Sequence, residues 1–136
     1  MTAVTHHTPC NWEHLPLIRC GERHGLPWCM HASPLGALNG YVRLPKTVQE
    51  DSIPAEVGVT FDRVAGPWAL FDTAHAGQWW ELDELVDLGV PITTDIRQLQ
   101  TVMREVWSGI RAPMTADKVQ TKIFQIADQL HELVRT

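Results

Sequence analysis

The sequence predicts an α+β fold in which a small antiparallel sheet of three or more strands is followed by a C-terminal helical hairpin. Apolar residues alternate with polar ones over residues 57–64, which is the period of a half-buried strand. After residue 93 they recur every three or four positions, which is the period of an amphipathic helix. The 136 residues fit a single domain, which we divide into a flexible lead (1–9), a loop-rich β part (10–92) and the helical hairpin, a candidate oligomerisation element (93–136).

The first half of the β part is expected to consist mainly of loops. Cys, His, Pro and Gly crowd residues 10–34, so we expect only one short strand there, over residues 17–20. The dipeptide Asn39–Gly40 is typical of a turn. Residues 41–44 then form a strand that ends at Pro45, because proline interrupts the hydrogen bonding of a sheet.

The second half of the β part contains the clearest strand pair. Residues 46–55 are polar and are expected to form a loop. The strand over 57–64 is followed by the tight connection 65–67 and by a second strand over 68–73. Short connections favour antiparallel neighbours, so these two strands and the strand over 41–44 predict a small antiparallel sheet.

Two helices are expected at the C-terminal end, after a short helical turn over residues 81–89. Thr93 or Thr94 caps the first helix and Pro113 ends it, while Thr115 caps the second. One apolar stripe is expected to pack on the sheet and the other to contact a second copy of the chain. The two stripes are Ile96, Leu99, Met103, Val106 and Ile110, and Val119, Ile123, Ile126, Leu130 and Leu133.

Composition and charge exclude several classes of protein. The chain carries 11 basic and 16 acidic side chains and has no basic block, which disfavours bulk nucleic-acid binding but still allows a single nucleotide held by one or two arginines. No apolar run approaches the length of a membrane span, and the N-terminus lacks the pattern of a secretion signal. Three cysteines are an odd number, consistent with reduced thiols. We therefore expect a cytoplasmic protein with no membrane partner.

Asp72 and His75 are the first candidate site residues, at the end of a predicted strand. Residues three apart on a strand point to opposite faces, so the two side chains meet only if the chain bends. The small residues Ala74, Ala76 and Gly77 permit such a bend. The carboxylate could orient the imidazole as a general base or phosphate ligand. The alternative is an aspartate that caps a turn beside a structural histidine.

Trp79, Trp80 and Arg43 are candidates for holding a planar ligand. In an extended chain the two indole rings face opposite ways, so one would point outward and could form a wall for a base. Packing in the core or under the helical hairpin is the alternative. Arg43 could grip a phosphate with its two-pronged guanidinium, or it could be a solvated arginine at a strand edge.

The Cys and His residues near the N-terminus could supply four zinc ligands. Their spacings lack the paired CxxC of known zinc modules, so buried thiols and surface histidines are the alternative. We accordingly predict no cofactor. If zinc is bound, the ligand set is Cys20, His24, Cys29 and His31.

The chain also lacks a glycine-rich phosphate loop, a nucleophile elbow and an HExxH motif. This leaves enzymatic activity undecided and favours a protein that is not an enzyme.

Three segments, NGYVRLP (39–45), VGVTF (57–61) and WALFDTAHAG (68–77), resemble a family of small proteins encoded by bacteriophages and prophages. Members of that family carry a GYV-x-x-P strand, an HGGLT-like strand and a W-x-GFD-x-AHAGD strand end. The resemblance implies a phage setting and a small α+β fold. The present chain lacks the histidine of the second motif, and Gln78 stands where the third motif ends in aspartate. Two ionisable groups that hydrolytic chemistry could use are therefore missing.

These observations lead to one leading hypothesis and two alternatives. The leading one is a phage-type, non-catalytic binding protein of the host cytoplasm, forming a homo-oligomer through its C-terminal helices and sequestering a small polar, nucleotide-like immune signal. The first alternative is a phosphoester hydrolase in which Asp72 orients His75. The second is a protein inhibitor of a host factor, built on the helical hairpin and Trp107. The expected ligand-binding residues are Arg43, Asp72, His75, Gln78, Trp79 and Trp80.

Overall fold

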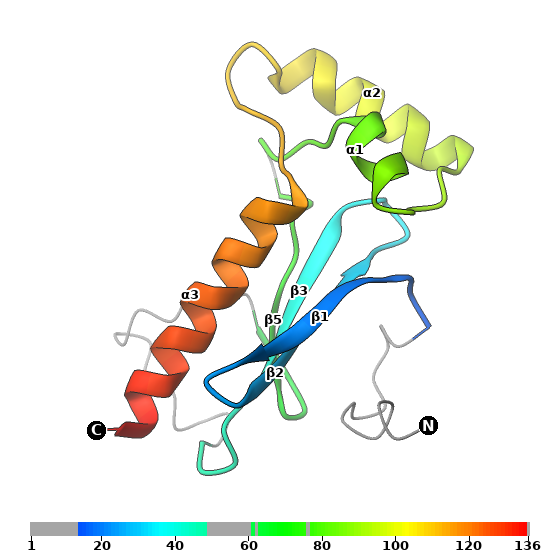
Figure 1. Cartoon of the computed structure of the whole chain (residues 1–136). Coiled ribbons are helices and arrows are strands. Elements are labelled where there is room, and N and C mark those ends of the chain that lie inside the picture. Colours follow the sequence, from blue (N-terminus) through cyan, green and yellow to red (C-terminus); the bar gives the residue numbers. More distant parts are fainter. Residues whose placement is uncertain (1–13, 49–60, 62, 76, 136) are drawn as a thin grey trace.

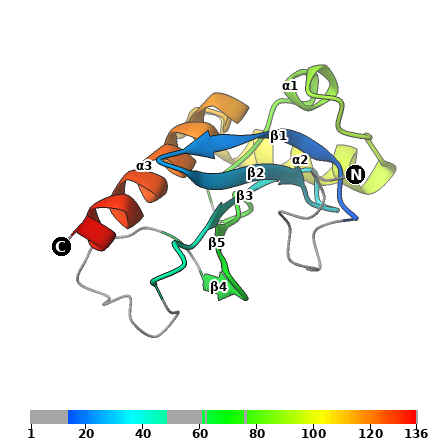
Figure 2. The same ribbon diagram turned by 60° about the horizontal axis from the view of Figure 1, so that its bottom comes forward.

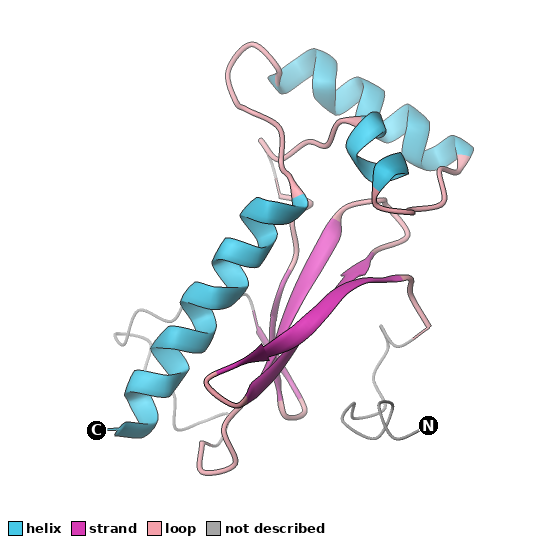
Figure 3. Cartoon of the chain, viewed as in Figure 1, coloured by secondary structure: helices cyan, strands magenta, loops and turns pink. Residues whose placement is uncertain are grey.

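The computed structural model describes residues 14–48, 61, 63–75 and 77–135. Within these ranges the chain forms one antiparallel sheet followed by helices, which confirms the predicted α+β class (Figures 1 and 3). The strands are β1 (Leu17–Arg23), β2 (Leu26–Ala32), β3 (Leu38–Arg43), β4 (Arg63–Ala65) and β5 (Trp68–Phe71). The helices are α1 (Leu82–Asp87), α2 (Thr94–Trp107) and α3 (Ala116–Arg135).

The five strands lie in the order β1-β2-β3-β5-β4, and every neighbouring pair is antiparallel. β1 confirms and extends the strand expected over residues 17–20. The expectation of loops over the rest of residues 10–34 is wrong for β2. His24 and Gly25 both have positive φ (55° and 76°), so they form a tight two-residue turn that connects β1 to β2 as a hairpin.

Asn39–Gly40 is not a turn, contrary to the sequence-based expectation, because both residues lie inside β3. The glycine is required there by packing. A Cβ atom at Gly40 would lie 2.5 Å from the ring of Phe71 and 2.9 Å from Ile123. The glycine thus allows the β5 aromatic ring and an α3 side chain to pack directly on the backbone of the central strand.

The remaining β part follows the predicted pairing where it is described. β4 and β5 pair antiparallel through a two-residue connection, Gly66–Pro67, in which Gly66 has a φ of 59°. Val48 donates a backbone hydrogen bond to Pro45, as a turn at the start of the expected loop requires. The rest of that loop and most of the strand predicted over 57–64 lie outside the described residues.

α3 covers one face of the sheet and completes the main hydrophobic core (Figures 1 and 2). The Thr115 hydroxyl accepts a hydrogen bond from the backbone of Lys118, which confirms the predicted cap. Four residues of the predicted stripe are completely buried against the strands, so this stripe is the one that packs on the sheet. They are Val119, Ile123, Ile126 and Leu130.

The opposite face of the sheet carries a second, smaller apolar cluster. Side chains alternate along β2, so Trp28 and Met30 join the core under α3 while Cys29 points the other way. The second cluster contains Cys29, Tyr41, Trp68 and Leu70.

α1 and α2 lie beyond one end of the sheet (Figure 1). The Thr93 hydroxyl accepts from the backbone of Ile96 and caps α2, as predicted. α2 diverges from α3 instead of lying antiparallel along it, and it buries only Ile96 and Gln100. The rest of its predicted apolar stripe is partly or fully exposed. Among the helices described, none is long and apolar enough to cross a membrane.

Candidate ligand-binding site

The loop after β5 brings Asp72 and His75 together, as the predicted bend requires. Asp72 Oδ1 lies 3.3 Å from His75 Nε2. The same oxygen accepts a hydrogen bond of 3.0 Å from the backbone N–H of Ala74, which is the geometry of an Asx turn. The aspartate therefore shapes the bend and contacts the imidazole at the same time.

Gln78 closes this loop with its side-chain amide. Its Oε1 accepts a 2.8 Å hydrogen bond from the backbone of His75, and its own backbone N–H donates to the His75 carbonyl at 3.0 Å. Gly77 has a φ of 87°, a conformation that favours glycine. The amide of Gln78 is thus engaged with the backbone of the loop.

The Asp72–His75 pair lies at the surface. The Asp72 side chain is 44% exposed and the His75 side chain 58% exposed. An exposed contact of this kind in water contributes little energy and gives little electrostatic stabilisation to a reacting group. The pair is therefore open to solvent.

Both tryptophans after the loop are buried, so the expectation of one outward-facing ring is wrong. Trp80 is 1% exposed and belongs to the main core. Its indole N–H donates to the Thr73 hydroxyl at 3.2 Å, and its backbone N–H donates to Gln100 Oε1 at 3.0 Å. Residues 78 and 79 lie outside any strand, and Trp80 forms an isolated bridge with Met114, so the two rings do not alternate between faces as they would in an extended strand. Trp80 is a core residue.

Trp79 is 4% exposed and occupies a different environment. Its indole N–H donates to the carbonyl of Arg111 at 2.9 Å, while its own carbonyl accepts from the backbone of Met114 at 2.7 Å. These two bonds fasten the segment after α2 to the segment before α1. Trp79 is also one of the residues that line a surface pocket.

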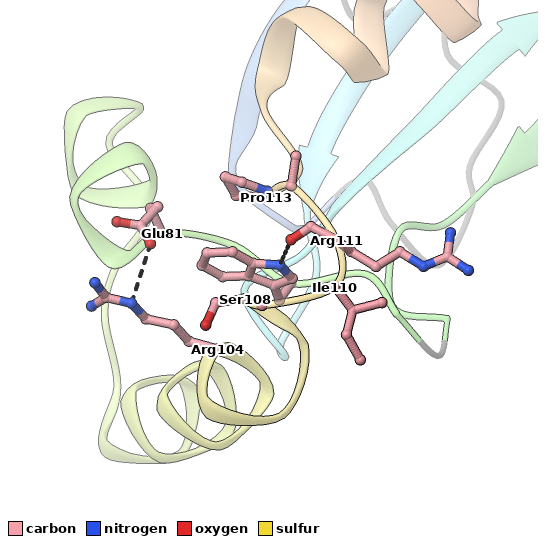
Figure 4. Close-up of a pocket in the computed structure, with 9 residues that line it drawn as sticks. Glu81, Arg104, Ser108, Ile110, Arg111 and Pro113 are labelled. Atoms are coloured by element: carbon pink, nitrogen blue, oxygen red, sulfur yellow. Dashed lines mark hydrogen bonds and ion pairs between the residues drawn. The ribbon is translucent and has the colours of Figure 1, made fainter.

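This pocket, which we call the Trp79 pocket, has a volume of about 480 Å³. It lies between the end of α2 with its following loop and the residues that precede α1 (Figure 4). On one wall Arg104 Nε lies 3.5 Å from Glu81 Oε1. The lining residues are Trp79, Glu81, Arg104, Ser108, Gly109, Ile110, Arg111, Ala112 and Pro113.

Arg111 joins the Trp79 pocket to the Asp72–His75 loop. Its backbone lines the pocket, and its side chain extends away from it (Figure 4). A Cβ atom at Gly77 would lie 3.3 Å from Arg111 Nε, so the guanidinium group packs on this loop. The Arg104 side chain therefore lies at the Trp79 pocket, whereas the Arg111 guanidinium lies outside it, beside the Asp72–His75 loop.

Arg43 lies away from this site. It pairs with Trp68 at the beginning of β5, whereas Asp72 follows the end of the same strand. Its guanidinium carbon lies 5.8 Å from the centre of the Trp68 ring. It lines a separate pocket of about 330 Å³ together with Lys46 and Pro67. The structure therefore does not unite Arg43 with Asp72, His75 and Trp79.

The four proposed zinc ligands do not converge either. Cys20 and Cys29 face each other in the middle of the β1–β2 hairpin, and His24 lies at its tip, where its ring stacks on His131 at 4.1 Å. His31 lies at the far end of β2 and its Nδ1 contacts the Leu15 carbonyl at 3.0 Å. Across the described ranges, no three His, Cys, Asp or Glu residues are arranged to hold a metal ion.

The pocket residues supplied by α2 and its following loop were not anticipated from the sequence. Arg104 lies on the polar side of an amphipathic pattern, and Arg111 lies between two helices, so neither carries a local signal. Only Gly109 and Pro113, which interrupt regular secondary structure, indicate that this segment is a loop. Comparison of the chain with protein-family models, with curated proteins and with solved structures finds no match.

Proposed function

We propose that the protein is a non-catalytic binding protein that holds a small anion with a flat apolar part, such as a nucleotide, in the Trp79 pocket. The observation that supports this proposal is the exposed Arg104 guanidinium at a pocket that Trp79 also lines. Aromatic rings offer a contact surface to flat groups, and guanidinium groups match the geometry of phosphate oxygens.

Arg104 is the arginine best suited to receive an anionic group. Its side chain is 65% exposed and its ion pair with Glu81 is long, at 3.5 Å. Such a pair is worth little in water, so an incoming phosphate can replace the carboxylate at small cost. Ser108, one turn further along the chain, adds a hydroxyl to the same wall.

The loop chemistry supports binding over turnover. Asp72 Oδ1 is shared between the turn backbone and His75, and both side chains are well exposed. Gln78, an amide, holds the loop where the phage-protein motif ends in a carboxylate. A phosphoester hydrolase that uses His75 as base and Asp72 as its orienter is the alternative, and the recovery of intact ligand distinguishes the two.

The motif resemblance supports a phage-type setting in the host cytoplasm. In such a setting, a protein that holds a nucleotide without cleaving it would lower the concentration of a nucleotide immune signal. The proposed role is therefore sequestration, which requires tight binding and a stoichiometric amount of protein.

The outer face of α2 supports the homo-oligomer part of the proposal. Val102 and Val106 are each 55% exposed, and Ile110, just past the helix, is 74% exposed. Spacings of four residues place them along one side, which a second copy can cover through a two-fold contact of like with like. A host protein on this same face is the inhibitor alternative.

The test is calorimetric titration of the full chain with a panel of cyclic and linear nucleotides. We expect Arg104→Gln to weaken the affinity for the bound nucleotide about tenfold or more, because one charge-assisted contact is lost. Arg97→Gln is the matched control, since this arginine lies on the same helix outside the Trp79 pocket. Equal affinities of the two variants would remove the pocket from the proposal.

A second measurement addresses catalysis. The protein is incubated with the bound nucleotide and then denatured, and the released small molecule is analysed by mass spectrometry. Quantitative recovery of intact nucleotide is expected for a sequestering protein. Recovery of a cleaved product would instead establish the hydrolase alternative.

A further inference from the structure

Two cysteines face each other across the β1–β2 hairpin. Cys20 on β1 is the direct antiparallel partner of Cys29 on β2. Directly opposed residues in an antiparallel pair point to the same face of the sheet. Cys29 belongs to the apolar cluster on the face opposite α3, so the Cys20 side chain projects from that face too.

The hairpin register defines how closely the two backbones approach at this pair. In a two-residue hairpin the residues that close the turn, here Arg23 and Leu26, exchange both backbone hydrogen bonds, and bonded and non-bonded pairs alternate from there. Counting back three pairs makes Cys20–Cys29 a non-hydrogen-bonded pair. The Cα atoms of such pairs lie about 4.5 Å apart, within the range of about 4.4–6.8 Å that a disulfide spans.

Pro27 supports this assignment of the register. It lies opposite Glu22, in the pair between the turn-closing pair and Gly21–Trp28. Proline has no N–H, so it is tolerated where the alternation leaves the backbone nitrogen without a bond to β1. The alternation that accommodates Pro27 is the same one that places Cys20 and Cys29 in a non-bonded pair.

The two thiols differ in access. Cys20 is exposed and Cys29 is completely buried. A small disulfide in solution can therefore reach Cys20, whereas Cys29 is reached through its cross-strand neighbour. This is the arrangement of an attacking cysteine with a resolving one.

We propose that Cys20 is a site of reaction with glutathione disulfide and that Cys29 resolves the adduct into a cross-strand disulfide. The Cys20 thiolate attacks one sulfur of glutathione disulfide, forming a mixed disulfide and releasing one glutathione thiolate. The Cys29 thiolate then attacks Cys20 Sγ and releases the second. The two protons lost by the cysteines end on the two glutathione thiols, so two protein thiols become one disulfide as one glutathione disulfide is reduced to two thiols.

The bond would fasten an edge strand. Among the strands that the structure describes, β1 is the outermost on its side of the sheet, next to β2. It also contacts α3, through Arg19 with Asp117 and through Arg23 with Asp128. Oxidation would therefore lock an edge strand that also contacts the covering helix, independently of ligand binding at the Trp79 pocket.

The experiment uses the full chain with Cys10→Ser, which leaves Cys20 and Cys29 as the two thiols. The protein is incubated with glutathione disulfide, alkylated and digested with trypsin without reduction. Cleavage after Arg19, Arg23 and Arg43 separates the cysteines into peptides 20–23 and 24–43. We expect a disulfide-linked pair of these peptides and the intact-mass loss of two hydrogens.

Variants separate the two steps. In the same background Cys29→Ala is expected to accumulate the glutathione adduct on Cys20, and Cys20→Ser is expected to lose both adduct and crosslink. Circular dichroism identifies a variant that fails to fold, and Cys29→Ser then serves as the second resolving-residue variant. A parent protein that keeps a stable adduct on Cys20, or that does not react at all, would overturn the proposal.

Discussion

Arg23 and Asp128 form two parallel hydrogen bonds, of 2.8 Å between Nε and Oδ1 and 3.2 Å between Nη2 and Oδ2. They join the end of β1 to α3. His24 Nε2 lies 2.7 Å from the same Oδ1, and its ring stacks on His131 with the ring planes only 4° apart. Asp128 thus anchors the tip of the β1–β2 hairpin to the covering helix.

Asp128→Asn is expected to lower Tm by only a few degrees at neutral pH, since both partners are substantially exposed and water screens the pair. The hydrogen bond from Arg23 lowers the pKa of Asp128, and Asp128 in turn raises the pKa of Arg23. A carboxyl group whose pKa is lowered by folding stabilises the protein at pH values above its unfolded-state pKa of about 4. This stabilisation is lost as the pH falls through the pKa of the folded state. Thermal melts at pH 7 and below pH 3 should show the difference between variant and parent disappearing in acid.

The matched control is Asp117→Asn. Asp117 pairs with Arg19 at 2.9 Å, but its side chain is 89% exposed. Its removal should change Tm less than removal of Asp128. A larger effect at Asp117 would contradict the anchoring role of Asp128.

Gly40→Ala is expected to destabilise the protein by about 1–3 kcal/mol, because the added methyl group overlaps the Phe71 ring and Ile123 at the centre of the core. Gly109→Ala is the control, since a Cβ atom there meets nothing within 4 Å. Both substitutions reduce the freedom of the unfolded chain alike. The difference in unfolding free energy between the two variants, measured with urea, therefore reports the cost of the overlap at Gly40. Equal unfolding free energies would contradict the predicted overlap.

Much of the fold could be predicted from local signals. Thr93 and Thr115 cap helices because their hydroxyls satisfy free backbone N–H groups, and this requirement depends only on neighbouring residues. β2 was missed because its proline and the preceding glycine look like loop signals. The strand register shows how both fit a β-hairpin: the glycine lies in the turn, and the proline lies in a pair that needs no backbone N–H. Gly40 was misassigned for a similar reason, because its Phe71 and Ile123 contacts come from distant parts of the chain.

Gln100→Met is expected to loosen α2. Gln100 is 4% exposed and its Oε1 accepts the backbone N–H of Trp80. Methionine keeps the volume but leaves that buried N–H without this acceptor, a cost of about 1–3 kcal/mol. Hydrogen exchange in α2 should accelerate, whereas the exposed neighbour variant Gln98→Met should exchange like the parent.

His75→Ala is expected to leave stability within about 0.5 kcal/mol of the parent, because the side chain is exposed and the loop bonds to Gln78 use only its backbone. The parent and the variant should both return bound nucleotide intact after denaturation. Cleavage by the parent together with none by the variant would support the hydrolase alternative.

Val106→Lys is expected to convert the protein to a monomer by placing a charge on the exposed apolar side of α2. Light scattering of the purified protein measures the mass directly. Thr101→Lys changes the polar side of the same helix and should preserve the assembly. A parent that is monomeric at high concentration would remove the homo-oligomer from the proposal.

The candidate site could be predicted only in part, and its chemistry explains why. Asp72, His75 and Gln78 meet through local turn geometry, so their proximity is readable from seven neighbouring residues. Arg111 reaches the same loop from the far side of two helices. Trp79 lies outside any strand, and the Arg111 carbonyl that holds its indole lies in an irregular segment after α2. Contacts of this kind depend on tertiary packing, which local patterns do not encode.

The position of α3 in the chain has a consequence for synthesis. The sheet face that it covers is made by residues that leave the ribosome earlier, whereas the side chains that bury it, from Val119 to Leu130, emerge later. Chains grow at about 5–20 residues per second, so the nascent sheet exposes an apolar surface for several seconds after β5 is complete. During that interval it is a target for chaperones and for contact with other nascent chains.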